Sequence, residues 1–327
     1  MPSALSLTLA ALVLLLLAVV GFVQLRAHQA ERAAENAYPA QGALIDVNGR
    51  KVHAVTQGSG PDLVIIHGAS GNTYDYTMSF VAPLLDRYRV TVFDRPGFGW
   101  SDRSAGYGGP FDRRSESPKE QAQMLREAAQ KLGITDPIIL GHSYGGAVTL
   151  AWALEYPEDP AALVMLSAVS NPWPGSVDRI HHINASVLGA AVVVPLATAF
   201  ANAERLQSVL ATIFAPQSPP EAYYAASAVP LAIRRNSLRL NAKQITRLKP
   251  FVIDMVPNYG AITVPTEILH GTADTIVSLK THSEPLSQQL PDATLTPLPG
   301  IGHMPHHVVP EAVNAAIDRA SARAGLR

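Results

Sequence analysis

A serine flanked by glycines is the residue of this sequence that most directly suggests chemistry. The segment GHSYG at 141–145 fits the pattern G-x-S-x-G, and it lies between the apolar run 137–140 and the helix-forming run 147–156. In that context the serine stands on a sharp turn from strand to helix, with its hydroxyl exposed and the glycines leaving room for the backbone. Ser143 is therefore the predicted nucleophile, and a plain glycine-rich turn is the alternative interpretation.

Histidines and the lack of cysteine limit the other chemistry that the chain can support. His303, His306 and His307 share one short segment, a grouping that suggests a metal site. No acidic residue is expected near them, and three side chains of one short loop rarely converge on one ion. The sequence has no cysteine, which excludes disulfides, thiolate metal sites and cysteine nucleophiles. We expect no metal and no organic cofactor, because hydrolysis by a serine needs only side chains and water.

Alternating apolar runs and helical patterns predict the scaffold that carries Ser143. Asn48-Gly49 joins two extended runs within 43–56 and is the typical dipeptide of a tight β-hairpin turn. Further strands are expected at 62–68, 89–94, 137–140, 163–169 and 266–271. Helices are expected over 74–86 and from a capping box at 117–120 to Leu132. The alternation indicates an α/β fold with a doubly wound, mostly parallel sheet and helices on both faces.

Five segments together resemble the α/β-hydrolase superfamily, in its serine-hydrolase branch with a helical cap, over essentially all of residues 43–327. HGASG (67–71) resembles the family's oxyanion loop, DRPGFGWSD (94–102) its turn after the fourth strand, GHSYGG (141–146) its nucleophile elbow, HGTADTIV (270–277) its acid loop and GIGHMPHH (300–307) its histidine loop. All five occur in the family's order. The resemblance implies a hydrolase with a serine, an acid and a histidine in its active site.

The resemblance assigns the catalytic triad to Ser143, Asp274 and His303. The imidazole would accept the serine proton, and the carboxylate would hold the other imidazole nitrogen. In this architecture the serine, the acid and the histidine follow one another in that order, and Asp274 lies just past a predicted strand. Asp178 and Asp254 are weaker alternatives, because neither follows a predicted strand.

The oxyanion that forms during acyl transfer needs two backbone N–H donors. The geometry of the elbow favours the amide of Tyr144, and the resemblance of HGAS to the family's loop favours that of Ala69. The residues expected to support the elbow and this loop are His67, Gly68, Gly141, His142 and Gly145. Haloalkane dehalogenases and epoxide hydrolases of this fold use aspartate where Ser143 stands, so the serine favours acyl-transfer hydrolysis.

The N-terminus has a different character from the rest of the chain. Residues 4–25 contain no charged side chain, and a helix of that length spans about 33 Å, the thickness of a hydrocarbon core. We expect an uncleaved membrane anchor there, with a cleaved signal peptide or a buried helix as the alternatives. A stalk should follow over 26–42, helical to about Tyr38. Arg26 and Arg32 lie after the span and no basic residue precedes it, which favours a cytoplasmic catalytic domain.

A long insertion predicts a lid over the active site. Between the strand that ends near Val169 and the strand that begins near Thr266 lie roughly 95 residues, more than a strand-to-helix connection needs. We therefore expect a helical cap over 171–262, inserted into a core made of 43–170 and 263–327.

Two stretches of the cap stand out by composition. Residues 183–203 carry no charge, but a membrane span there would separate Ser143 from His303, so an apolar cap helix broken at Pro195 is expected, over the pocket or against lipid. Basic residues recur at four-residue steps further on, at Arg235, Arg239, Lys243 and Arg247. In a helix they form one stripe, either a solvated face or a surface for anionic headgroups.

The composition and charge of the chain limit the classes of function that it can have. The chain has 327 residues, 47% of them hydrophobic, with 25 Lys and Arg against 26 Asp and Glu, so a globular protein without a nucleic-acid footprint is expected. We predict hydrolysis of a small-molecule ester, hydrophobic or lipid-like, by an enzyme whose partner is the membrane. Hydrolysis of C–C bonds or amides, cofactor-free perhydrolysis and a non-catalytic binding protein are the alternatives.

Overall fold

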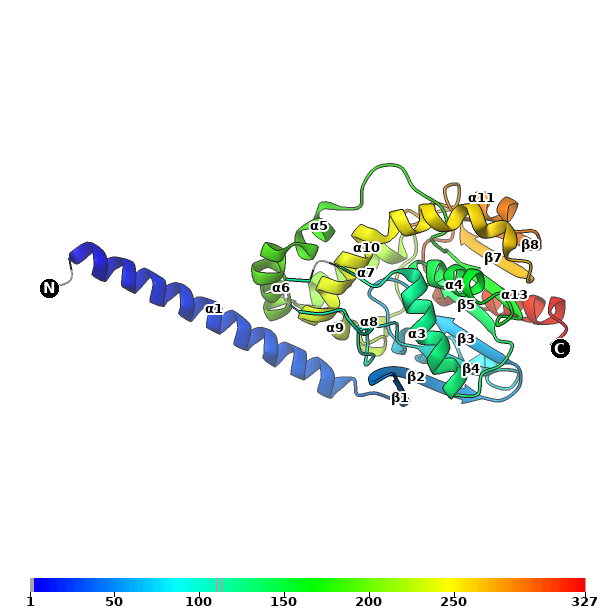
Figure 1. Cartoon of the computed structure of the whole chain (residues 1–327), viewed down its shortest axis with the longest axis horizontal. Helices are drawn as coiled ribbons and strands as arrows, with labels where there is room; N and C mark the ends of the chain where they lie inside the picture. Colours follow the sequence, from blue (N-terminus) through cyan, green and yellow to red (C-terminus); the bar gives the residue numbers. More distant parts are fainter. Residues whose placement is uncertain (1–2, 110, 113, 327) are drawn as a thin grey trace.

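One eight-stranded sheet organises the body of the protein in the computed structural model, which describes residues 3–109, 111–112 and 114–326 (Figure 1). The strands are β1 (Ala43–Val47), β2 (Arg50–Gly58), β3 (Asp62–Ile66), β4 (Arg89–Phe93), β5 (Ile138–His142), β6 (Ala162–Leu166), β7 (Thr266–Gly271) and β8 (Ala293–Leu298). They lie in the order β1-β2-β4-β3-β5-β6-β7-β8. β2 is antiparallel to β1 and β4, whereas the other neighbours are parallel. The predicted mostly parallel sheet is confirmed.

Helices cover both faces of this sheet, as predicted. The helices of the core are α2 (Tyr74–Thr77), α3 (Pro118–Lys131), α4 (Tyr144–Glu155), α11 (Ser283–Gln289), α12 (Pro305–Val308) and α13 (Pro310–Arg323). Val64 of β3 packs in one core cluster with residues of α3 and α4. Its neighbour Leu63 packs in a second cluster with residues of α13. Successive side chains of a strand point to opposite faces, so a continuous apolar run is buried on both sides.

The structure confirms a turn and a helix cap that local sequence signals predict. The hairpin at Asn48-Gly49 is present, and both residues have positive φ angles, of 52° and 78°. The capping box between Ser117 and Glu120 is formed in both directions.

The helix predicted over 74–86 is wrong. The chain forms the short α2 and then a 3-10 turn, η1 (Ala82–Leu84). Pro83 has no backbone N–H to donate, and in a continued α-helix its ring would clash with the carbonyl group of Ser79, so it lies in the first turn of η1 and does not extend α2.

The N-terminal helix is one continuous rod, α1 (Ala4–Ala37). Its first half projects away from the body in Figure 1, and in its second half Ala27 and Ala34 are buried against the rest of the protein. The helix continues past the apolar run to Ala37, as expected, whereas the predicted stalk with limits 26–42 stays a prediction. Among the described residues, α1 is the one unbroken helix long and apolar enough to cross a membrane, and a signal sequence meets the same criterion.

Helices fill the connection between β6 and β7. They are α5 (Arg179–Ala185), the π-helical η2 (Gly189–Val193), α6 (Val194–Phe200), α7 (Ala203–Phe214), α8 (Tyr223–Ala226), α9 (Val229–Ala232), α10 (Arg235–Met255) and the 3-10 turn η3 (Val256–Ala261). We refer to α5 through α10 as the cap. The limits of 171–262 that the sequence suggests for the cap remain a prediction.

The apolar stretch of the cap is broken, but not at Pro195. The bend of 86° lies between α5 and η2, and the two helices pass the length and hydropathy criteria for a span only when taken together. Pro195 is the second residue of α6, which follows the π-helical η2 without a break, and the bend does not lie there. Gly189 permits the bend instead, because a Cβ there would lie 1.7 Å from the carbonyl oxygen of Ile183.

Candidate active site

Ser143 occupies a strained position between β5 and α4. Its φ and ψ angles are 52° and −119°, a conformation that side chains rarely adopt. The glycines around it are needed for close packing: a Cβ on Gly145 would lie 2.2 Å from the carbonyl oxygen of Ile66, and one on Gly141 would lie 2.3 Å from Oγ1 of Thr149. The turn therefore has the geometry of a nucleophile elbow, with the serine at its apex.

The structure brings Ser143, His303 and Asp274 into one hydrogen-bonded chain. Nε2 of His303 lies 3.0 Å from Oγ of Ser143, and Nδ1 of His303 lies 2.7 Å from Oδ2 of Asp274. The serine and the histidine are 7% and 5% exposed, so the pair is largely shielded from water. Because an ionised Asp274 can only accept hydrogen bonds, Nδ1 carries the proton and Nε2 is free to accept the proton of the serine.

Asp274 is held as a carboxylate by its surroundings. Burial alone would raise its pKa, but hydrogen bonds from His270, His303 and the backbone of Val277 lower the pKa below its usual range. Oδ1 accepts the N–H groups of Ile276 and Val277 at 2.8 and 2.9 Å, which leaves Oδ2 for His303. His270 also approaches Oδ2, at 3.2 Å. Sequence reasoning missed this residue, because nothing in the acid-loop motif shows where its ring points.

The loop after β3 lies against Ser143. A Cβ on Gly68 would stand 3.1 Å from Cβ of Ser143, so the next residue, Ala69, lies beside that serine. Tyr144 is the first residue of α4, where backbone N–H groups have no acceptor within the helix. Both amides therefore come from segments that border Ser143, as an oxyanion site requires.

Arg95 is a buried cation beneath this loop that sequence reasoning missed. Its Nε and Nη2 donate to the carbonyls of His67 and Gly68, each at 3.0 Å, and its backbone N–H donates to Nε2 of His67. Its Nη1 reaches Gln244 of the cap at 2.8 Å, and its guanidinium lies 4.4 Å from the ring centroid of Tyr144. Burial lowers the pKa of Arg95 to about 10 and, together with Arg95, lowers that of His67 to about 4. His67 is thus a neutral support of the loop.

His142 joins the elbow to the histidine loop. Its Nε2 lies 2.9 Å from the carbonyl oxygen of His303, and a carbonyl can only accept, so Nε2 carries the proton. Burial, with His306 and His303 close by, holds the pKa of His142 well below its usual value. A neutral His142 therefore fixes the backbone of His303 without adding charge.

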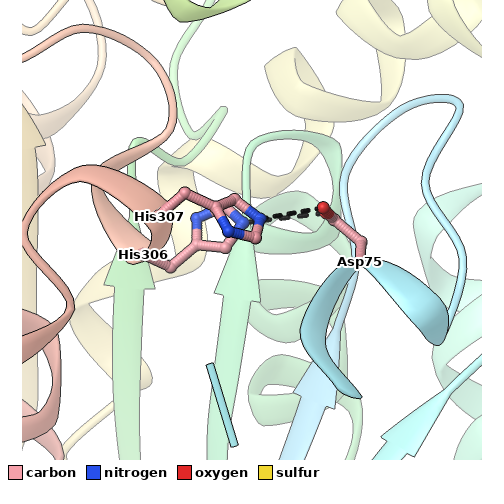
Figure 2. Close-up of side chains that lie close together, drawn as sticks. All are labelled: Asp75, His306 and His307. Carbon is pink, nitrogen blue, oxygen red and sulfur yellow. Dashed lines mark hydrogen bonds and ion pairs between the residues drawn. The ribbon is translucent and has the colours of Figure 1, made fainter. Parts of the chain in front are cut away.

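A carboxylate lies beside the other two histidines, contrary to our expectation that no acidic partner is near. Asp75 of α2 meets His306 and His307 of α12, with the candidate ligand atoms within 4.8 Å of one another (Figure 2). Oδ1 of Asp75 accepts from Tyr223 of the cap at 2.6 Å and from Nε2 of His307 at 2.9 Å. The partners come from segments far apart in the sequence, so the sequence alone did not predict the cluster.

The surroundings of Asp75 compensate its charge. Burial would raise its pKa, but the hydrogen bond from His307 and the nearby ring of His306, 3.7 Å away, keep the pKa well below its usual range. Burial also lowers the pKa of His306 to about 4. The cluster joins the cap, through Tyr223, to the loop that carries His303. The absence of a metal here stays a prediction.

This fold and this site define an α/β hydrolase: a mostly parallel sheet, a serine on the turn after β5, and a histidine and an aspartate from loops after later strands. Residues 61–310 match the family described as alpha/beta hydrolase fold, and the chain belongs to that family.

Curated relatives carry several different names. Haloalkane dehalogenase 2 of Mycobacterium tuberculosis is 28% identical over 86% of this chain and 94% of its own length. The magnesium-chelatase 30 kDa subunit of Rhodobacter capsulatus is 30% identical over 79% of this chain and 86% of its own length. Lipase 1 of Psychrobacter immobilis is 26% identical over 76% of this chain and 72% of its own length. These relatives leave the substrate open.

Solved structures share the fold at low sequence identity. An esterase from Exiguobacterium antarcticum is 20% identical, with a TM-score of 0.68, over 86% of this chain and all of its own chain. A membrane phospholipase A described as a bacterial virulence factor is 21% identical, with a TM-score of 0.66, over 96% of this chain and 98% of its own. At this level of identity the likeness concerns the fold alone.

Proposed function

We propose that this chain is a serine hydrolase that cleaves carboxylic esters through an acyl-enzyme on Ser143. The observation that carries the proposal is the hydrogen-bonded chain from Oγ of Ser143 through His303 to Asp274, with distances of 3.0 and 2.7 Å. Membership of the hydrolase family supports it, as do a lipase among the relatives and an esterase among the similar structures.

In the first half of the reaction, Nε2 of His303 accepts the proton of Ser143 while Oγ attacks the ester carbonyl carbon. The backbone amides of Ala69 and Tyr144 stabilise the oxyanion of the tetrahedral intermediate. When the intermediate collapses, the bond to the alcohol oxygen breaks, and His303 gives its proton to the leaving alcohol.

In the second half, water attacks the acyl-enzyme and His303 accepts its proton. The ester bond to Oγ then breaks, the carboxylic acid leaves, and the proton returns to Ser143. Asp274 stays ionised throughout and stabilises the imidazolium that forms in each half.

A fluorophosphonate probe tests the assignment of the nucleophile. We expect the native protein to be labelled covalently and Ser143→Ala to be unlabelled, while Ser287→Ala on α11 keeps full labelling. Aryl-ester hydrolysis should disappear in step with labelling. Labelling that survives in Ser143→Ala, or that is missing in the native protein, would refute the proposal.

Dehalogenation is the second candidate, because a dehalogenase is among the similar curated proteins. Displacement of a halide by Oγ of Ser143 would leave an ether, which has no carbonyl for water to attack, so the enzyme would stop after one event. A carboxylate nucleophile would instead give an ester, which water can cleave. We expect no catalytic halide release from alkyl halides; sustained release by the native protein would favour this candidate.

We also propose a hydrophobic, lipid-like substrate. The enzyme takes it from the membrane in which α1 anchors the protein. The cap exposes large apolar side chains, among them Leu188 at 73% and Phe200 at 54%. α5 and α6 lie at the end of the body from which α1 projects (Figure 1). The likeness to a membrane phospholipase A supports a lipid substrate.

Two experiments test this part. In a series of aryl esters, turnover should increase from acetyl to long acyl groups, and a preference for acetyl would contradict a lipid-like substrate. Full-length protein should sediment with membranes and resist extraction by high salt, whereas removal of residues 1–25 should release it. The prediction that the body faces the cytoplasm can be checked by protease protection of intact vesicles.

A further inference from the structure

A large cleft lies beside the anchor helix, away from the triad. It has a volume of about 950 Å³ and opens between α1, the segment 97–109 and α10. Gln24, Glu31 and Glu35 of α1 line one side of it. None of the three triad residues, all of which the structure describes, is part of its lining. The cleft is therefore a concave site that does not include Ser143, Asp274 or His303.

Positive charge dominates this cleft. Among the described residues, six cations line it, namely Arg50, Arg103, Arg234, Arg235, Arg239 and Lys243. Three carboxylates accompany them, those of Glu31, Glu35 and Asp102. A concave surface with surplus charge of one sign concentrates ligands of the opposite sign.

Some of these cations already have carboxylate partners. Arg235 pairs with Glu31 at 2.6 Å and Arg234 with Glu35 at 3.1 Å, which holds the second half of α1 against the cap. Arg103 pairs with the buried Glu116, outside the cleft, at 2.9 Å. The predicted basic stripe on α10 is thus helical, but part of it binds the anchor helix and is not a solvated face.

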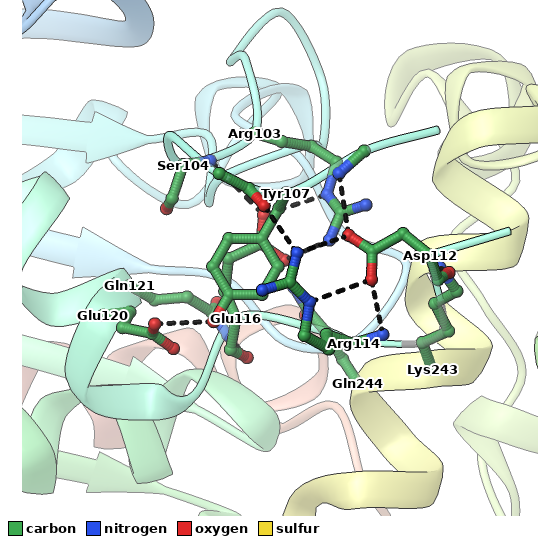
Figure 3. A network of polar contacts seen from close by, with 12 residues as sticks. Arg103, Ser104, Tyr107, Asp112, Arg114, Glu116, Glu120, Gln121, Lys243 and Gln244 are labelled. Carbon is green, nitrogen blue, oxygen red and sulfur yellow. Dashed lines mark hydrogen bonds and ion pairs between the residues drawn. The ribbon is translucent and has the colours of Figure 1, made fainter. Parts of the chain in front are cut away.

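The next two stripe residues contact backbone oxygens. Nζ of Lys243 donates to the carbonyl of Asp112, and Arg239 donates to the carbonyls of Gly109 and Asp112 at 3.4 and 3.5 Å. In Figure 3, Lys243 extends from α10 toward the segment that carries Asp112, whose carboxylate pairs with Arg114. Lys243 is only 2% exposed. Burial and the nearby Arg239 and Arg103 lower its pKa to about 8, as expected where positive charge exceeds negative charge.

The position of the cleft indicates what kind of anion reaches it. The apolar part of α1 ends at Leu25, next to the lining residue Gln24, so the cleft begins where the predicted span leaves the hydrocarbon. Val187, Ala190 and Val194 of the cap add an apolar wall. Phosphate groups of lipids lie at this depth, with their acyl chains beside them.

We propose that this cleft binds the phosphate headgroup of an anionic phospholipid from the membrane that holds α1. Guanidinium groups bind phosphate oxygens through paired N–H donors, and an ammonium adds a point charge. The apolar wall accommodates the adjoining part of the acyl chains. The proposal rests on the anchoring role of α1 and not on ester hydrolysis at Ser143.

Native mass spectrometry of the full-length protein in a mild non-ionic detergent tests the site without a bilayer or turnover. We expect one phosphatidylglycerol to bind about fivefold or more tightly than phosphatidylcholine, since each basic group near a headgroup contributes roughly that factor. Arg239→Gln with Lys243→Gln should remove this preference. Arg50→Gln, at an exposed lining position of the hairpin, should weaken it in a protein whose fold is undisturbed.

Arg247→Gln is the matched control, because Arg247 is exposed on the same helix and does not line the cleft. It should keep the preference, and melting curves should confirm that each variant is folded. Equal binding of the two lipids by the native protein, or a preference unchanged by both the double variant and Arg50→Gln, would overturn the proposal. So would competition by inorganic phosphate alone, which would indicate a site for a free anion. Membrane sedimentation and aryl-ester turnover, measured in parallel, report separately on the anchor and the hydrolase.

Discussion

At the scale of single residues, the orientation of His303 depends on Asp274. The carboxylate uses Oδ1 for two backbone N–H groups and Oδ2 for Nδ1 of His303. An amide in its place would present a donor to that nitrogen or lose the backbone contacts, so the imidazole would take the wrong tautomer.

Asp274→Asn should therefore lower kcat for ester hydrolysis by roughly 10³ to 10⁴-fold while the fold is retained. Steady-state kinetics with an aryl ester provide the measurement. Asp254→Asn, at an exposed position of α10, is the control and should leave kcat unchanged. A reduction of less than about tenfold in Asp274→Asn would assign the orienting role to another group.

A second prediction concerns Arg95, which we propose as a positioning residue for the oxyanion loop. Lysine retains the charge but cannot donate to the carbonyls of His67 and Gly68 and to Gln244 at once. We expect Arg95→Lys to lower kcat about tenfold to a hundredfold with little change in KM, because a misplaced amide of Ala69 weakens stabilisation in the transition state only. Arg247→Lys serves as the control. An equal rise in KM with kcat preserved would instead indicate a role in substrate binding.

The sequence revealed the residues whose signal is local and missed those whose partners are distant. Ser143 stands within a five-residue pattern, Asp274 follows a recognisable strand, and His303 lies in the segment GIGHMPHH at 300–307. The bond from Arg95 to Gln244 joins residues 149 positions apart, and that from Tyr223 to Asp75 joins residues 148 apart. No periodicity or spacing encodes such pairs.

At the scale of the elements, the crossing of β3 and α4 depends on Gly145. A methyl group there would lie 2.2 Å from the backbone oxygen of Ile66, and neither backbone can move without displacing Ser143. Gly145→Ala should lower stability by about 1–3 kcal/mol and abolish most activity. Thermal unfolding and fluorophosphonate labelling measure the two effects. Gly260→Ala is the control, since a Cβ there would lie 4.0 Å from its nearest neighbour, the backbone oxygen of Gln289, and it should change neither.

Elements with strong patterns were predicted, and the weakly patterned ones were not. Each of β3, β5 and β6 is an apolar run buried on both faces. β8 lies at the edge of the sheet, and most of its residues are partly exposed, so ATLTPL showed no apolar run to detect. The sequence predicts the break of the cap helix at Pro195, whereas Gly189 permits the bend that the structure shows. Proline is a visible signal for a break, but the steric contact that requires a glycine cannot be recognised in the sequence.

At the scale of the whole molecule, buried neutral histidines make stability depend on pH. Burial lowers the pKa of His67, His282 and His306 from 6.5 to about 4. Between these values the unfolded chain binds protons that the folded protein does not, so stability is complete above pH 6.5 and is lost as the pH falls toward 4.

The melting temperature should accordingly fall as the pH is lowered from about 7 to 4. His282→Gln should make this decrease shallower, because one of the titrating groups is gone, whereas His182→Gln at an exposed position should not. Differential scanning calorimetry at constant ionic strength provides the measurement. A melting temperature that is flat or rises toward low pH would contradict the prediction.

The rod formed by α1 has a consequence for kinetics. The helix runs without a break from its apolar half to the half held by Arg234 and Arg235, so the body cannot swivel freely about α1. If α1 anchors the protein in a membrane, as we propose, the enzyme meets its substrate by lateral diffusion, always at one height and tilt above the lipid surface. Its rate should then follow the mole fraction of substrate in the surface, and diluting that surface with inert lipid should slow it even when the bulk concentration stays constant.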